Sequence, residues 1–118
     1  MLEAGVDIIE IDRIEGALAR HGQRFLDRVY TALEQAQCKG SAQSLAARFA
    51  AKEAAFKALG QRFGWLEVEV RRQPGGKPSL AFYGGAKEMA DRLGLKECTA
   101  SLSHNRGNAV AIVVVSNR

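Results

Sequence analysis

The chain has 118 residues, of which 47% are hydrophobic and 25% are charged. This composition excludes disordered and fibrous chains and predicts a single domain over residues 1–118. No apolar run approaches the roughly 20 residues that cross a bilayer, and the acidic N-terminal segment lacks the basic start of a signal peptide, so we expect a cytoplasmic protein without a membrane helix. The formal net charge of +4 favours an anionic partner: nucleic acid, a phosphorylated ligand or an acidic protein.

The first half of the chain predicts a strand followed by helices. Branched apolar side chains over residues 2–11 predict the strand. Asp12 and Glu15 have the spacing of a capping box at the start of the first helix. The alanine-rich last helix of this half is closed by Gly60. The three helical patterns cover residues 12–22, 25–36 and 43–59.

The second half predicts two hairpins separated by a helix. The helical spacing runs over residues 86–93 and stops at Gly94. Strand patterns flank two turn-like segments, and they cover residues 65–70, 80–82, 99–104 and 109–115. Hairpins require antiparallel pairing, so the expected fold class is α+β, with a mainly antiparallel sheet packed against a long central helix.

The predicted long helix carries charges where a buried helix is normally apolar. Lys52 falls within the apolar stripe, and Glu53 and Lys57 lie at its edge. Buried charges are costly unless they are paired or hold a ligand. An alternative is that Glu53 and Lys57 form an exposed pair one helical turn apart and that Lys52 extends to water.

Asp7 and His104 are two further isolated polar residues. Asp7 interrupts an apolar strand, and together with Glu53 it offers two carboxylates to a hard cation such as Mg²⁺, which fills its other positions with water and substrate phosphates. An alternative for Asp7 is a solvent-facing position on the strand. His104 ends a predicted strand, where a polar cap is the alternative to a catalytic group. Neither a Walker phosphate loop nor a hydrolase nucleophile motif is present.

Taken in order, these segments resemble the holo-acyl-carrier-protein synthases. The matching motifs are GVDIIEI (residues 5–11), RFAAKEAAFKALG (48–60), GKP (76–78) and SLSH (101–104). The resemblance implies the fold of a 4′-phosphopantetheinyl transferase. Such an enzyme moves the phosphopantetheine arm of coenzyme A onto a serine of apo acyl carrier protein and releases adenosine 3′,5′-bisphosphate.

The resemblance also implies a catalytic group made of Asp7, Glu53, Lys57 and His104. Asp7 and Glu53 match the family's two Mg²⁺ ligands, and Lys57 matches a lysine beside the phosphates. Two roles stay open for Glu53, as a metal ligand or as a base acting through water. His104 matches a histidine at the coenzyme A site.

Further basic residues take binding roles in the same comparison. Arg48 and Lys52, with Lys57 and His104, belong to the coenzyme A site, where the first two hold phosphate oxygens or shape the site. Arg13 and Arg20 share one helix face and match the surface that docks the acidic carrier protein; for two arginines, a solvated basic face is the alternative.

Family members of this length are homotrimers with active sites between subunits, so we expect the same assembly here. The sequence departs from many relatives after Gly60, where they continue with a Gly-Thr-Gly stretch and a longer loop, and it is short over residues 35–47. The alternative function is a non-enzymatic basic module that binds nucleotide or nucleic acid. The transferase is preferred because it explains Asp7 and Glu53, and with it we expect no nucleic-acid partner.

Overall fold

The computed structural model describes residues 1–118 and contains a three-stranded antiparallel sheet in the order β1-β5-β4. Its first and last strands along the chain are neighbours, with Leu2 opposite Ser116. A turn at Asn105 joins β4 to β5, because the Asn105 side chain accepts hydrogen bonds from the backbone N–H groups of Gly107 and Asn108. The strands are β1 (Leu2–Glu10), β4 (Glu97–His104) and β5 (Asn108–Ser116).

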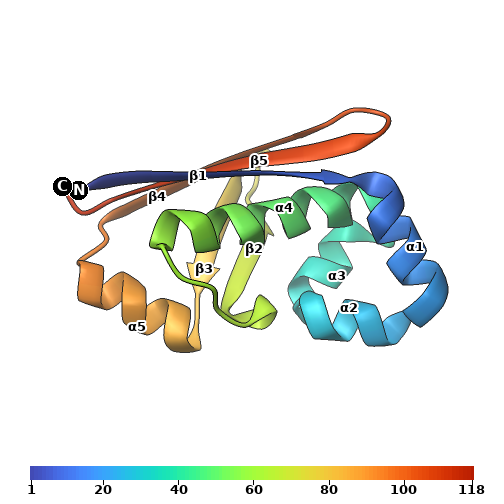
Figure 1. The fold of residues 1–118 in the computed structure, drawn as a ribbon, viewed down its shortest axis with the longest axis horizontal. Helices are drawn as coiled ribbons and strands as arrows, with labels where there is room; N and C mark the ends of the chain where they lie inside the picture. The colour runs from blue at the N-terminus through green and yellow to red at the C-terminus, as the bar shows by residue number, and fades with distance from the viewer.

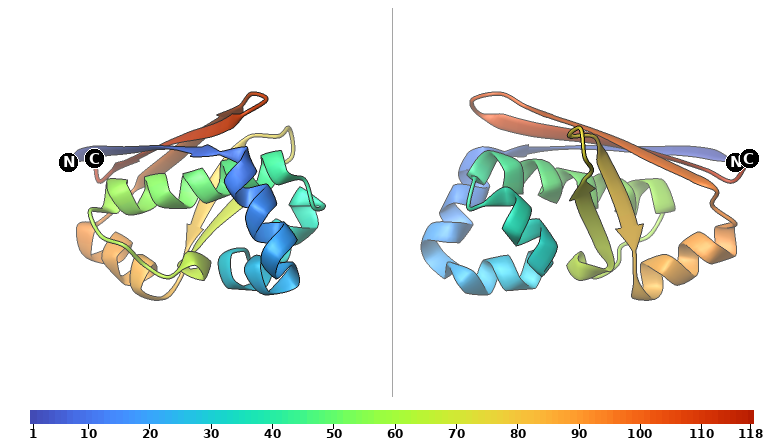
Figure 2. Two further views of the ribbon diagram at one scale, coloured as in Figure 1. Left: turned by 45° about the vertical axis from the view of Figure 1, so that its right-hand side comes forward. Right: turned by 180° about the vertical axis from the view of Figure 1, so that it is seen from behind.

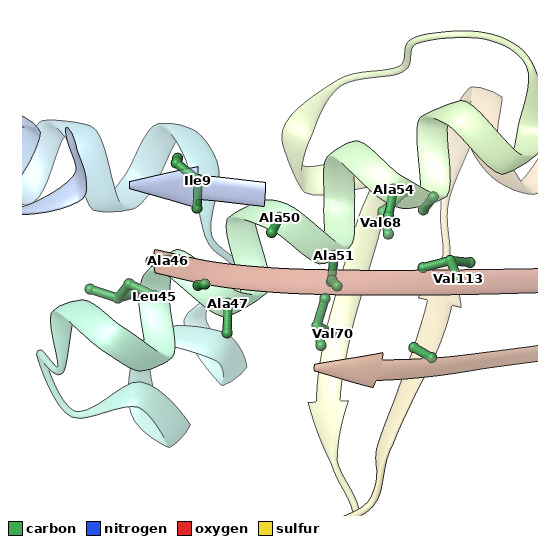
Figure 3. Close-up of a cluster of buried hydrophobic side chains, with 14 of the residues drawn as sticks. Ile9, Leu45, Ala46, Ala47, Ala50, Ala51, Ala54, Val68, Val70 and Val113 are labelled. Atoms are coloured by element: carbon green, nitrogen blue, oxygen red, sulfur yellow. The ribbon is translucent and has the colours of Figure 1, made fainter. Parts of the chain in front are cut away.

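Helix α4 (Ala42–Leu59) lies along one face of this sheet and forms the centre of the molecule (Figure 1). Figure 3 shows its alanines between β5 on one side and the side chains of Val68 and Val70 on the other. Ala50, Ala51 and Ala54 are fully buried. Because methyl groups take little space, the helix packs closely against elements on both sides.

The remaining elements surround the two ends of α4. Helices α1 to α3 gather at one end, and α5 lies at the other, near both chain termini (Figure 1). The β2–β3 hairpin stands beside α4, and its turn reaches the level of the larger sheet (Figure 2). These elements are α1 (Ile11–His21), α2 (Gln23–Val29), α3 (Ala32–Cys38), the 3₁₀ helix η1 (Trp65–Glu67), β2 (Val68–Arg72), β3 (Pro78–Phe82) and α5 (Gly84–Leu93).

The α+β class with a mainly antiparallel sheet against a long central helix is confirmed. Three local predictions are wrong. The expected helix over residues 25–36 is two helices, because Thr31 and Glu34 form a capping box that starts a new helix. Asp12 is not an N-cap, since α1 begins at Ile11 without a side-chain cap. Residues 65–67, expected as strand, form η1. None of the helices is long and apolar enough to cross a membrane.

Candidate active site

Gly5 brings β1 into direct contact with the backbone of α4. A Cβ at this position would lie 2.0 Å from the carbonyl oxygen of Ala54 and 2.8 Å from the backbone nitrogen of Ala58. Side chains alternate along a strand, so Asp7 points to the same side as Gly5. The glycine therefore sets Asp7 close to the C-terminal half of α4.

Asp7 is paired with Lys57 of α4. The Lys57 Nζ lies 3.1 Å from Oδ1 of Asp7 and donates a second hydrogen bond, of 2.9 Å, to the carbonyl oxygen of Val6. The Asp7 side chain keeps 20% of its surface exposed, and that of Lys57 keeps 55%. Both groups are thus held in place while remaining open to a ligand from solvent.

Glu53, one turn before Lys57 on α4, is paired with a different cation. The guanidinium of Arg62 donates to both of its carboxylate oxygens, at 2.8 and 3.3 Å. The pKa of Arg62 is raised, chiefly because Glu53 accepts its hydrogen bonds, then by the charge of Glu53 and, to a smaller extent, of Asp7. Two partly exposed carboxylates therefore lie in one region, each balanced by one cation.

The two carboxylates fit a magnesium ion better than a closed metal cage. No group of three or more histidine, cysteine, aspartate or glutamate side chains is arranged to hold a metal. Mg²⁺ is commonly bound through one or two carboxylates, with water and phosphate oxygens completing its octahedron. Asp7 and Glu53, 20% and 19% exposed, supply oxygen ligands of that kind.

A second group of site residues lines a basic cleft of about 340 Å³. Arg48 is buried, and its guanidinium donates a 2.8 Å hydrogen bond to the carbonyl oxygen of Val70. Arg71 is paired with Glu69, but no acidic residue lines the cleft itself, so its charge suits an anion. The cationic and titratable lining residues are Arg48, Arg71, Arg72 and His104. The sequence identified the first and last of these four but not the two arginines of β2.

The structure places the two groups at opposite edges of the sheet. Asp7 lies on the edge strand β1, and His104 lies on the other edge strand, β4, with β5 between them. Neighbouring strands are about 4.8 Å apart, so roughly 10 Å of sheet separates the two edges. Arg48 and Lys57 are about two and a half turns apart and so face opposite sides of α4. Within one chain, Asp7, Glu53 and Lys57 come together, but His104 and Arg48 do not join them.

Lys52 lies in the core and does not line the basic cleft. Its Nζ donates to Oε1 of Glu34 at 2.7 Å and to the carbonyl oxygens of Val29 and Trp65, both at 2.8 Å. Burial lowers the pKa of Lys52, and the Glu34 charge opposes that shift. An ammonium group has three donors, and all are used here, so Lys52 has none left for a phosphate. Of its two expected roles, the geometry supports shaping the site.

Glu34 is the counter-ion of Lys52, and sequence reasoning did not identify it. Its Oε1 also accepts from the backbone N–H of Thr31, and its Oε2 accepts from that of Val70, both at 2.8 Å. The carboxylate thereby joins α3, α4 and β2. The Thr-x-x-Glu spacing was the available signal, because it marks a capping box.

Arg13 and Arg20 border a separate groove of about 420 Å³ on α1. The groove has an apolar floor that includes Ile14, Phe25 and Phe49. Both arginines are exposed and lie on the same groove, as their spacing predicted. Asp12 also lines the groove, so its border carries two positive charges and one negative charge. An apolar floor with a net basic border is complementary to an amphipathic acidic helix.

Comparison with known proteins places the whole chain in one family. Residues 3–113 match the model of the 4′-phosphopantetheinyl transferase superfamily. The holo-[acyl-carrier-protein] synthase of Herpetosiphon aurantiacus is 49% identical over 124 residues, covering 97% of this chain and 98% of that protein. The one from Dehalococcoides mccartyi is 49% identical over 119 residues, covering 99% and 100%.

Solved structures agree with the sequence relatives. The Helicobacter pylori holo-[acyl-carrier-protein] synthase, crystallised in complex with coenzyme A, superposes with a TM-score of 0.88 at 35% identity, covering 96% of this chain and 99% of that one. The Neisseria meningitidis enzyme superposes with a TM-score of 0.85 at 31% identity, covering 97% of each. The chain therefore belongs to the 4′-phosphopantetheinyl transferase superfamily and, within it, to the enzymes of the holo-[acyl-carrier-protein] synthase family.

Proposed function

We propose that this enzyme transfers the 4′-phosphopantetheine of coenzyme A to a serine of apo acyl carrier protein and that the reaction requires Mg²⁺. The serine oxygen bonds to the phosphorus that bears the pantetheine, the diphosphate P–O bond breaks, and adenosine 3′,5′-bisphosphate leaves. The observation that carries the proposal is the pair of partly exposed carboxylates, Asp7 and Glu53, beside one end of α4 in a member of this family.

Asp7 and Glu53 would hold the Mg²⁺, which neutralises charge on the diphosphate when bound. Lys57 lies beside Asp7 with 55% of its side chain exposed, so its ammonium group can turn to a phosphate oxygen. Arg48 and His104, in the basic cleft, would bind the anionic nucleotide portion of coenzyme A. The groove bordered by Arg13 and Arg20 would dock the acidic carrier protein.

The outer face of the sheet supports a homotrimer with sites between subunits. This face is turned away from α4 and is apolar over β1 and β5. Nothing in the single chain covers it, and Val6 is 57% and Ile8 65% exposed. Open apolar sheet faces normally pack against another surface. Its members are Leu2, Ala4, Val6, Ile8, Val110, Ile112 and Val114.

A cyclic assembly through this face explains why the site residues are divided. In a ring of identical chains, each interface joins two different surfaces of neighbouring subunits. Such a ring can bring the β1 edge, with Asp7, of one subunit beside the β4 edge, with His104, of the next. We propose that each active site is completed in this way.

Incubation with coenzyme A, Mg²⁺ and an apo acyl carrier protein tests the activity. The carrier should gain the mass of phosphopantetheine, and chelation of the metal should stop the gain. A carrier whose acceptor serine is replaced by alanine is the control. Failure of several apo carriers to gain mass with intact, folded enzyme would refute the proposed transfer.

A further inference from the structure

The loop after α4 places Arg62 against Glu53, where its guanidinium is bonded to the carboxylate. Gly60 adopts a left-handed conformation, with φ of 79°, and the backbone N–H groups of Gly60 and Gln61 both donate to the carbonyl oxygen of Phe56. This turn reverses the chain, so that Arg62 returns toward the helix end that carries Glu53.

Aromatic rings hold the guanidinium from the other side. The Arg62 Cζ lies 5.3 Å from the ring centre of Phe56 and 5.4 Å from that of Trp65, within the range of cation–π attraction. A planar guanidinium also matches both oxygens of a carboxylate at once. Three side chains, Glu53, Phe56 and Trp65, thus fix this otherwise exposed side chain.

We propose that Arg62 is the counter-ion of Glu53 in the ligand-free protein and that a divalent cation binds only by displacing it. This inference rests on the proposed role of Glu53 as a metal ligand. Both oxygens of Glu53 accept hydrogen bonds from Arg62, so a metal and this guanidinium compete for the same lone pairs. Lys57 does not have this role toward Glu53, because its ammonium group is bonded to Asp7 and to the Val6 carbonyl.

The competition has a measurable size. Arg62 is 63% exposed, and exposed ion pairs are weak, so its removal should tighten Mn²⁺ binding to the coenzyme-A-free protein about two- to fivefold. Mn²⁺ takes the same oxygen ligands as Mg²⁺, and the free ion can be counted by its paramagnetic resonance signal. The variant is Arg62→Gln, and the control is Arg92→Gln, which removes the same charge from an exposed position on α5.

Trp65 gives a second readout that does not depend on catalysis. It is the sole tryptophan of the chain, so its fluorescence reports whether Arg62 stays on its ring. Added Mg²⁺ should change the emission of the wild type and of Arg92→Gln, whereas Arg62→Gln should bind metal with a smaller change.

Glu53→Gln separates this inference from the proposed function. If Glu53→Gln weakens Mn²⁺ binding while Arg62→Gln and Arg92→Gln bind with equal affinity, the competition is refuted and the metal site stands. If Glu53→Gln binds Mn²⁺ as the wild type does, Glu53 is not a ligand, and both the metal assignment and the competition fail.

Discussion

Asp7 and Glu53 stand out among the acidic residues because each is partly exposed and yet fixed by a single cation. Neither carboxylate is part of the packed core, and exposed or half-exposed ion pairs contribute only about 0–1 kcal/mol to folding. We therefore expect their loss to affect ligand binding much more than stability. This separation makes the two residues suitable for a direct test.

Asp7→Asn and Glu53→Gln should each reduce transfer by roughly 100-fold or more, as the loss of a charge-stabilising group does in other active sites. The rate of carrier mass gain measures this effect, and urea unfolding checks that the free energy of unfolding changes by no more than about 1 kcal/mol. Asp91→Asn, which also breaks an exposed pair, on α5, is the matched control and should keep full activity. Full activity in either site variant would contradict the metal assignment.

Glu69 makes stability depend on pH. Burial raises the pKa of its carboxyl. Hydrogen bonds from Thr31, Arg71 and Tyr83 together lower it by more than burial raises it, so the net pKa lies below the ordinary 4.5. A depressed pKa contributes stability above the unfolded-state value, and this contribution is lost as the pH falls through the folded-state value.

Urea unfolding near neutral pH and at about pH 3 should show this loss in the wild type, and a smaller one in Glu69→Gln, which cannot ionise. Glu88→Gln, at an exposed position of α5, should lose as much stability on acidification as the wild type. Equal acid sensitivity of the wild type and Glu69→Gln would show that another group controls this part of the pH profile.

The candidate residues could be predicted in part because each was out of place in its own segment. Asp7 interrupts an apolar strand, and Lys52 and Glu53 interrupt an apolar helix. Their partners could not be predicted. Arg62 and Glu34 are polar residues in segments with ordinary patterns, and only tertiary structure shows that the first reaches Glu53 and the second lies buried against Lys52.

At the level of elements, β1 and α4 are joined by a backbone contact that depends on Gly5. Gly5→Ala should push the strand away, because the added methyl group meets main-chain atoms that cannot rotate aside. We expect a loss of about 1–3 kcal/mol in the free energy of unfolding, as for other overpacked positions, together with reduced transfer, since Asp7 moves with the strand.

Gly107→Ala is the control for this substitution, because a Cβ at Gly107 meets no atom within 4 Å. Its free energy of unfolding should stay close to that of the wild type. A Gly5→Ala protein as stable and as active as Gly107→Ala would show that β1 is not held by this contact.

The buried pair of Lys52 and Glu34 connects five elements at once, α2, α3, α4, η1 and β2. Lys52→Met should cost about 3–5 kcal/mol in unfolding free energy, because it leaves the Glu34 carboxylate buried without its counter-ion. Lys87→Met breaks an exposed pair on α5 with the same substitution and should cost no more than about 1 kcal/mol. Urea unfolding compares the two; similar costs would mean that the buried pair is not structurally important.

Helices and strands could be predicted where the apolar periodicity was strong. The prediction failed where a capping residue, and not the periodicity, set the start of a helix. The long helix and both hairpins follow from apolar spacing and turn residues. The division of residues 25–36 depends on Thr31, whose side chain begins α3. A helical stripe continues across that point in the sequence, so spacing alone did not reveal the break.

On the scale of the whole molecule, the division of the site between two sheet edges is the main observation. The strand order β1-β5-β4 separates Asp7 from His104. Sequence patterns identify strands but not their order in a sheet, so this separation was not predictable from residue spacing.

Mixing two inactive variants tests whether neighbouring subunits share a site. We expect Asp7→Ala and His104→Ala each to be inactive alone. The two variants are unfolded and refolded together in equal amounts. Each site then has an intact Asp7 with a chance of one in two and, from the next subunit, an intact His104 with the same chance, so about a quarter of wild-type activity should return. Asp7→Ala mixed with Glu53→Ala, which damages the same half, should regain none. Light scattering gives the mass of each assembly; no recovery in trimers containing both variants would show that each subunit contains its own site.

The pairing of β1 with β5 also has a consequence for the order of folding. Leu2 pairs with Ser116, so β1 finds its partner only when β5 has emerged from the ribosome. Contacts of such long sequence separation form late and slow the folding of a small domain. Since β5 lies between the strands that carry Asp7 and His104, neither sheet edge can be placed before β5 has been made. A nascent chain should therefore acquire its helices well before it acquires either half of its site.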